Sequence, residues 1–481
     1  MSELDRQENK NQEHEILAKE ALEHPELFER RSYIEDDALL RQFGIHIPGK
    51  QSFAPGYLKL WPEDFIVEEV GLEGEVYTVT RENLLAPESE FEYAPTTFAT
   101  LVKCGVSTIE AIDDMVAQLG CDRTAIGYAG IKDRDALTAQ RISFRKISPQ
   151  KLKTLSSPYF FLKDISTSKG SVATGGLRGN RFTLLIRTPQ TFFQKETLDT
   201  FAQNLVHIKE HGFSNFFYLQ RFGTPRLQNY IWGLAILRGE YEGAVFGALT
   251  YQAERELPYF KQLRAQCATL WGDWEAIETL IAPFPIIFRH DLKLVRYLRE
   301  HPDDFSGALS QISDQVVLWV YALASRYFNE ALSKHVVANT ALPATLPLML
   351  GFNKKSWSPY ETELKRDGIF PPPFENLKPF PFLQIRDRSL PTADTPTLLG
   401  AQACTEGLIL SFELGKGQYA TTFLSHLVNL VSGKPPEYLT TTQVDTKGAL
   451  GQTSIADTLA YFAPIIRSKI DTESELSEAK E

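Results

Sequence analysis

The sequence predicts an α+β protein in which a strand-forming part is interrupted by a mainly helical insertion. Strand patterns occur before about residue 211 and return after about residue 400. Between them, residues 224–252, 258–282 and 311–336 have the apolar spacing of helices. Prolines at 371–373, 379 and 381 mark a long irregular connection before the strands resume. Segments far apart in the sequence are therefore expected to build one domain.

The first 37 residues are acidic and show no large apolar face, so we expect them to form a loosely attached or disordered extension. They carry 12 acids and 5 bases, and residues 470–481 carry five acids and one base. These two tails account for the whole net charge of −11, because residues 38–469 hold 44 acids and 44 bases. A segment with equal numbers of acids and bases can still carry its bases on one face, and phosphate binding requires such a basic face. The acidic total therefore does not exclude a nucleic-acid partner.

Local signals predict the elements of the first strand-forming part. Strands begin near Leu58, and Glu75–Arg81 has high β-propensity. Ser107 and Glu110 form a capping box, so a helix should start there and end at Gly120.

Further along, alternation predicts strands over Arg141–Phe144 and Phe182–Ile186. A helix follows from Leu198 to Ile208, closed by Gly212. The last expected strand is Leu408–Leu414, after which glycines at 415 and 417 make a turn.

Composition limits the class of protein. A chain of 481 residues can form two or three domains. It has no run of 18 apolar residues, and its acidic start is unlike a signal or transit peptide, so we expect a cytoplasmic protein without a membrane partner. The cysteines and the nine histidines show no metal-ligand spacing, so no metal site is expected. The sequence does not reveal the oligomeric state, and a monomer is the expectation.

The segment Gly127–Gln140 holds the most informative chemistry. Two glycines allow a tight turn, and Lys132-Asp133-Arg134 then places a carboxylate between two cations. Nearby positive charge favours the ionised carboxylate, which suits a nucleophile or a base. An aspartate in an ordinary turn, bonded to its own backbone, is the competing interpretation.

This segment resembles the signature G-x-A-G-x-K-D-x-x-A-x-T-x-Q of the TruD family of tRNA pseudouridine synthases. Four more segments resemble family motifs in the family's order, within a span from about Lys59 to Leu427: Pro62–Glu69 (P-E-D-F-x-V-x-E), Leu177–Leu184 (L-x-G-N-x-F-x-L), Gly212–Gly223 (G-x-x-N-Y-F-G-x-Q-R-F-G) and Gly417–Thr422 (G-S-[YF]-A-T). Three departures are Tyr218 where the family has Gly, Gln418 where it has Ser, and a lengthened segment at 83–96.

The resemblance implies a pseudouridine-synthase core whose mixed sheet carries the active site, interrupted by an inserted TRUD domain. The corresponding limits are 1–37 for the extension, 38–211 and 391–435 for the core, 212–390 for the insertion and 436–481 for a C-terminal extension with an acidic tail. The implied enzyme is an isomerase that converts uridine to pseudouridine in tRNA, at uridine 13 in the D-arm. The reaction breaks the N1–C1′ bond and joins C5 to the same C1′, so it requires no cofactor.

The resemblance assigns the catalytic carboxylate to Asp133, with the neighbouring Asp135 as its competitor. The carboxylate either attacks C1′ or removes a ribose proton, and the sequence does not choose between these routes. A buried carboxylate needs a cationic partner, and Lys59 stands where the family has a basic residue. Its alternative role is a solvated lysine at a strand edge.

The reacting base must leave the RNA stack before it can react, and aromatic faces hold such a base. Phe65, Phe182 and Tyr419 occupy the family's aromatic positions, although aromatic residues in strands usually pack in cores. Asn180 offers a donor and an acceptor for uracil or ribose, or it is a turn residue beside Gly179. The candidates for RNA contact are Lys132, Arg134, Arg181 and Arg221, the last of which could instead lock the insertion in place.

Two other functions compete with this one. The first is a non-catalytic RNA-binding or RNA-remodelling protein on the same scaffold, which would not need Asp133, Lys59 and Tyr419 together. The second is a glycosidase or another hydrolase, which would need two placed carboxylates. Only one is supported by the motif, unless Asp135 supplies the second.

Overall fold

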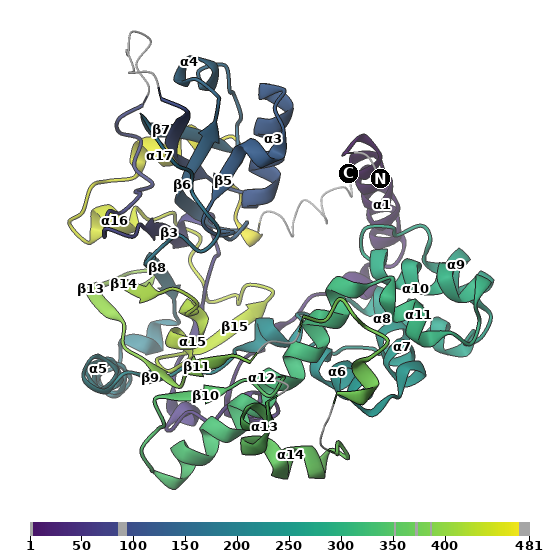
Figure 1. Ribbon diagram of the computed structural model, residues 1–481. Coiled ribbons are helices and arrows are strands. Elements are labelled where there is room, and N and C mark those ends of the chain that lie inside the picture. The colour runs from purple at the N-terminus through teal and green to yellow at the C-terminus, as the bar shows by residue number, and fades with distance from the viewer. Residues whose placement is uncertain (1–2, 85–93, 351–352, 371–373, 385–386, 471–481) are drawn as a thin grey trace. The chain divides into compact units, whose positions relative to one another are not determined.

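The computed structural model describes residues 3–84, 94–350, 353–370, 374–384 and 387–470 (Figure 1). Most of the lengthened segment 83–96, the prolines 371–373 and the acidic tail from 471 lie outside the described residues. The chain divides into two compact units. One consists of Met1–Gln51 and Ser214–Ala393, and the other, which we call the sheet unit, of Ser52–Phe213 and Asp394–Glu473.

The sheet unit is built on a mixed β-sheet. Its strands are β2 (Pro55–Tyr57), β3 (Phe65–Val70), β4 (Thr96–Lys103), β5 (Ile126–Tyr128), β6 (Leu137–Arg145), β7 (Phe160–Ser168), β8 (Gly179–Arg187), β13 (Thr397–Cys404), β14 (Gly407–Gly415) and β15 (Asn429–Gly433). The central strands follow the order β15-β2-β8-β3-β6-β4-β7, in which β3 and β6 are parallel and β8 is antiparallel to β3.

Strand β8 joins the parts of the sheet that come from either side of the insertion. Residues 179–184 pair with β3 on one edge and with β14 on the other. Figure 1 shows this arrangement as blue strands next to yellow-green ones, from early and late in the chain. The sheet confirms the predicted α+β class and the return of the chain to the core after the insertion.

Helices cover the sheet: α3 (Thr108–Leu119), α4 (Pro149–Leu152), α5 (Lys195–His211), α15 (Ala420–Ser425), α16 (Thr446–Ala449) and α17 (Ala456–Phe462). Helix α3 confirms the predicted capping box, because Ser107 N donates to Glu110 Oε2 at 2.8 Å and Gly120 closes the helix at φ +57°. The residues expected to form a C-terminal extension contribute to the core of this unit, where Phe462 of α17 packs on Phe161.

The strand predicted over Glu75–Arg81 is wrong. Only Val76 forms a bridge, to Val70, and no ladder follows. Val79 N instead donates to the side chain of Glu68, at 2.9 Å. A buried carboxylate thus takes a hydrogen bond that a neighbouring strand would otherwise accept, and β-propensity cannot anticipate this competition.

The other unit is mainly helical. Its helices are α1 (Glu3–Glu23), α2 (Asp37–Arg41), α6 (Asn229–Arg238), α7 (Tyr241–Thr250), α8 (Pro258–Thr269), α9 (Trp274–Ile281), α10 (Arg289–Glu300), α11 (Phe305–Ser310), α12 (Ser313–Ala338), α13 (Lys354–Trp357) and α14 (Glu361–Arg366). Two short strands, β10 (Thr345–Pro347) and β11 (Ser389–Pro391), pair beside them. Within the described ranges, no helix is both long enough and apolar enough to cross a membrane.

Within this segment, Glu3–Glu23 form helix α1, which corrects the expectation of disorder for that part of the extension. Ile16 and Leu17 pack on the core of the helical unit, and Ala21 is buried. The 5% exposed side chain of Glu13 accepts a hydrogen bond from Ile286 N at 2.7 Å. Helix α1 is thus attached through a few apolar side chains and one buried carboxylate. Because these contacts do not require a broad apolar face, the sequence of the helix does not show the pattern expected of a docked helix.

The departure from the family motif at Tyr218 has a structural reason in the same unit. Its side chain is buried, and its hydroxyl donates to Glu35 Oε2 at 2.7 Å. A glycine could not make this bond to the N-terminal segment. Residues up to 51 therefore group with the insertion and not with the core expected from residue 38. The domain limits at 211, 390 and 435 remain predictions.

Candidate active site

The loop between β5 and β6 places Asp133 beside Lys59. Asp133 Oδ2 accepts a hydrogen bond from Lys59 Nζ at 2.8 Å. The Asp133 side chain is 53% exposed, so a substrate can reach it, whereas that of Lys59 is 23% exposed. The competitor Asp135 is also exposed but forms no ion pair among the described residues. The paired cation thus distinguishes the two carboxylates.

Lys59 is held in an uncommon conformation. Its φ is +61°, which a residue other than glycine adopts at a local cost. Its Nζ lies 4.1 Å from the centroid of the Phe65 ring, a distance at which a cation is attracted to the ring face. The contacts of Lys59 are therefore with the two groups that the motifs assign to the site.

A buried lysine holds the backbone of the loop that carries Asp133. Lys103, the last residue of β4, donates to the backbone oxygens of Asp133 (2.6 Å) and Val106 (2.8 Å). Burial lowers the pKa of the fully buried Lys103 ammonium to about 8. Sequence reasoning missed this residue, because an isolated lysine at the end of a strand carries no motif signal.

Lys132 is also buried, which corrects its assignment as an RNA contact. Its side chain is 5% exposed, and its Nζ lies 2.8 Å from Glu69 Oε2. The same Nζ donates to Asn180 Oδ1 at 2.7 Å. The structure therefore connects Asn180 to the motif that carries Asp133, through a lysine that faces the protein interior.

The three predicted aromatic residues differ in exposure. Phe65 and Phe182 are buried and meet edge to face, with ring centroids 6.1 Å apart. Phe182 also stacks on Phe412 at 5.2 Å. Tyr419 is 46% exposed, and among the described residues no hydrogen bond joins it to Asp133 or Lys59. Its ring is the one that remains open to a ligand.

The arginines assigned to RNA contact lie in different surroundings. Arg181 donates twice to Glu413, at 2.7 and 2.9 Å, and it points to the opposite face of β8 from Asn180 and Phe182. Arg134 is 54% exposed and lies 3.6 Å from Glu110. Arg221 belongs to the helical unit, where it lies over the Phe217 ring.

Two buried ion pairs fix the frame of the site and were not anticipated. Arg187 donates to both oxygens of Asp64, at 2.8 and 2.9 Å, and both side chains are fully buried. Lys447 pairs with Glu68 at 2.5 Å. Asp64 and Glu68 lie in the Pro62–Glu69 motif, so the motif could have suggested them. Nothing in the sequence marks Arg187 or Lys447 as their partners.

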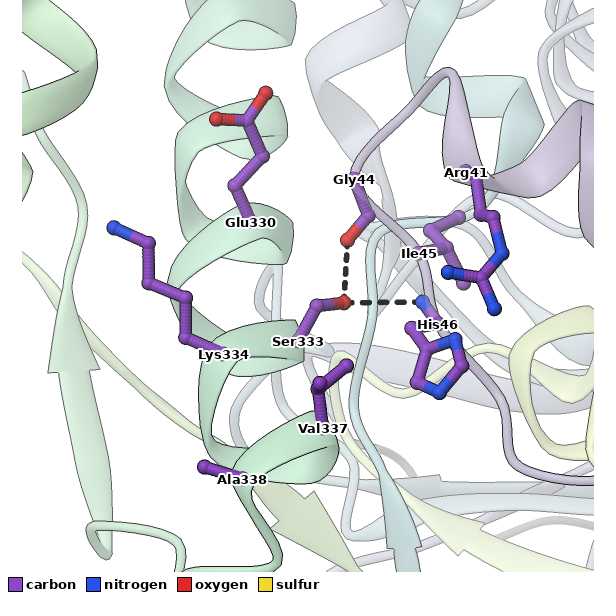
Figure 2. Close-up of a pocket in the computed structure, with 9 residues that line it drawn as sticks. All are labelled: Arg41, Gly44, Ile45, His46, Glu330, Ser333, Lys334, Val337 and Ala338. Carbon is purple, nitrogen blue, oxygen red and sulfur yellow. Dashed lines mark hydrogen bonds between the residues drawn. The ribbon is translucent and has the colours of Figure 1, made fainter.

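A cavity of about 530 Å³ lies in the helical unit (Figure 2). None of the predicted site residues lines it. Ser333, at its wall, donates to Gly44 O at 2.6 Å and accepts from His46 N at 3.0 Å. The hydroxyl is thus engaged in backbone contacts and is not arranged as a nucleophile.

Comparison with known proteins agrees with the motifs. The family model described as tRNA pseudouridine synthase D (TruD) matches residues 50–347. A probable tRNA pseudouridine synthase D 1 of Methanocaldococcus jannaschii is 26% identical over 392 residues, covering 78% of this chain and 96% of that protein. A tRNA pseudouridine synthase D of Geobacter sp. strain M21 is 29% identical over 293 residues, covering 61% and 67%.

A solved structure shares the fold. The crystal structure of a putative tRNA pseudouridine synthase D from Methanosarcina mazei superposes with a TM-score of 0.62 at 22% sequence identity. The likeness covers 80% of this chain and 97% of that one.

Proposed function

This chain belongs to the TruD family of tRNA pseudouridine synthases, and on that premise we propose that it isomerises uridine 13 in the D-arm of tRNA, with Asp133 as the catalytic carboxylate. Members of the family are isomerases. Both the position and the residue go beyond family membership. The geometry of the Asp133 loop supports the residue, whereas the position is what the resemblance to the family implies.

The observation that carries the proposal is the contact between Asp133 and Lys59, at 2.8 Å, in an exposed loop of the sheet unit. A nearby cation favours the charged form of a carboxylate. Attack on C1′ and removal of a ribose proton both begin from that charged form. Lys59 thus supports either route by holding the Asp133 carboxylate in place through an ion pair.

Contacts that hold the loop backbone in place also support a catalytic role for Asp133. Lys103 holds the backbone of Asp133 from within the protein, and Lys132, the preceding residue, forms an ion pair with Glu69. The carboxylate is therefore exposed on a backbone that has little freedom to move. Fixed placement of a reacting group lowers the barrier, because its orientation is arranged before the substrate binds.

The position of modification is tested with transcripts that carry no other modification. Purified protein is incubated with a tRNA transcript that has uridine at position 13, and pseudouridine is mapped by carbodiimide treatment and reverse transcription. We expect a single stop that corresponds to position 13, and none with cytidine there. Pseudouridine at other positions only would contradict the proposed position.

Tyr419 is expected to hold the flipped base by stacking, since it is the exposed one of the three predicted aromatic residues. Tyr419→Phe should therefore change the single-turnover rate little. Tyr419→Ala should cost about 1–3 kcal/mol in the base-holding step. The melting temperature is the control, because a ring that only packed in a core would lower stability and leave the turnover of the folded enzyme normal.

A further inference from the structure

We propose that the buried Glu69–Lys132 pair fixes the side-chain amide of Asn180 so that its NH2 group faces the substrate and selects a uracil carbonyl oxygen. This inference rests on the function proposed above and adds to it the group that reads the base. Lys132 and Glu69 are positioning residues, and Asn180 is the residue that determines specificity.

The three side chains form one network across two strands and a loop. Glu69 on β3 and Asn180 on β8 are direct partners in the antiparallel ladder, so their side chains share a face of the sheet. Lys132 Nζ lies 2.8 Å from Glu69 Oε2 and 2.7 Å from Asn180 Oδ1. The side chains of Glu69 and Lys132 are 1% and 5% exposed.

The orientation of the amide follows from the chemistry of lysine. An ammonium group has three donors and no acceptor, so only an oxygen can lie at hydrogen-bond distance from it. The atom of Asn180 that meets Lys132 is therefore Oδ1, and the NH2 group lies on the other side. Turning the amide over would place two donors face to face, in a buried setting where an unmade hydrogen bond costs about 1–3 kcal/mol.

The NH2 group of Asn180 remains available for a ligand. Among the described residues, the only hydrogen bond of this side chain is the one from Lys132, and the residue is half-buried. Its strand neighbour Phe182 points to the same face and meets Phe65, which lies under Lys59. The donors are thus presented on the face of the sheet that carries the catalytic pair.

Fixed donors favour uracil over cytosine in the state of the base in which they meet the C4 substituent. Uracil has carbonyl oxygens at C2 and C4, whereas cytosine has an amino group at C4, and a donor facing a donor leaves both unpaired. The isomerisation rotates uracil about its N3–C6 axis, which exchanges N1 with C5 and O2 with O4. A carbonyl oxygen therefore occupies the same place before and after the rotation, and one donor can hold the base in both states.

The first test replaces Asn180 by aspartate, which keeps the shape and the acceptor for Lys132 but removes the donors. We expect the single-turnover rate with a uridine-13 transcript to fall at least tenfold, with melting temperature and tRNA affinity nearly unchanged. The matched control is Asn353→Asp in the helical unit, where the side-chain oxygen caps a helix by accepting from Lys355 N, and it should have no effect. A near wild-type rate for Asn180→Asp would overturn the proposal.

The second test identifies the contacted atom with thio-substituted substrates, because sulfur is a weaker acceptor than oxygen. Wild-type enzyme should react more slowly with 2-thiouridine or 4-thiouridine at the target position than with uridine. Asn180→Ala should lose that difference while reacting slowly with all three. If the thio penalty persists in Asn180→Ala, the amide does not hold a carbonyl and the proposal fails.

The third test addresses the positioning role. The double substitution Glu69→Gln/Lys132→Gln removes both charges and leaves the amide of Asn180 free to turn, so it should lower the single-turnover rate of an enzyme that retains Asn180. In the Asn180→Ala background, the same double substitution should not lower the rate further. Full additivity of the effects would show that the pair acts elsewhere. Failure of wild-type enzyme to form pseudouridine would instead overturn the proposed function, and with it this inference.

Discussion

Asp133→Asn is expected to abolish pseudouridine formation while the protein folds and binds tRNA as before. Asparagine keeps the size of the side chain and an acceptor for Lys59, which lies 2.8 Å away, but it has no negative charge. Both routes for the reaction need that charge, so the rate should fall at least roughly 1,000-fold. The measurement is the nucleoside composition of a digested tRNA transcript after prolonged incubation with enzyme.

Stability and tRNA affinity are the controls for this variant. The Asp133 side chain is 53% exposed, and the loop is also held by Lys103 through a backbone oxygen, so the fold does not depend on the carboxylate. We expect unchanged melting and binding, or slightly tighter binding because one negative charge is removed near phosphate. Pseudouridine formation by Asp133→Asn at a rate close to that of the wild type would contradict the assignment.

Arg187→Met is expected to destabilise the protein by about 3–5 kcal/mol, because it leaves the buried Asp64 carboxylate without a cation to pair with. Both side chains are fully buried, and Arg187 also donates to the backbone oxygens of Thr440 and Thr442. The substitution thus removes the cation that links the Pro62–Glu69 motif to the C-terminal segment. Chemical denaturation of the full-length protein measures the effect.

The same strand provides a matched control. Arg181 pairs with Glu413 on β14, but these side chains are 30% and 22% exposed. A pair of that kind contributes about 0–1 kcal/mol, so Arg181→Met should have a small effect. If Arg187→Met were no more destabilising than Arg181→Met, the buried pair would not hold the frame of the site as described.

The elements that the sequence predicted well are those with local signals. The capping box at Ser107 and Glu110 sets the start of α3, and alternation over residues 182–186 marks β8. In the candidate site, the family motifs predicted five residues: Asp133, Lys59, Phe65, Asn180 and Phe182. In the structure Lys59 contacts Asp133 and Phe65, Phe65 meets Phe182, and Asn180 accepts a hydrogen bond from Lys132, the neighbour of Asp133. Their catalytic roles stay predictions.

The features that the sequence could not predict depend on partners far away in the chain. Lys132 looked like a surface cation because it stands beside Asp133, but Glu69 and Asn180 on two other strands enclose it. Residues 1–37 looked disordered because their anchors, such as Glu13 at Ile286 N, are polar and non-local. The burial of a charged side chain cannot be predicted from sequence unless the residue that pairs with it is known.

The central claim is that Asp133, and no neighbouring carboxylate, acts in the isomerisation of uridine in tRNA. Joining C5 to C1′ releases the hydrogen of C5, so a transcript labelled with tritium at that carbon reports each turnover. In a single-turnover experiment, the wild type and Asp135→Asn should release one equivalent of tritium per target uridine at similar rates, and Asp133→Asn should release none although it binds the transcript. Tritium release by Asp133→Asn together with its loss in Asp135→Asn would contradict the account.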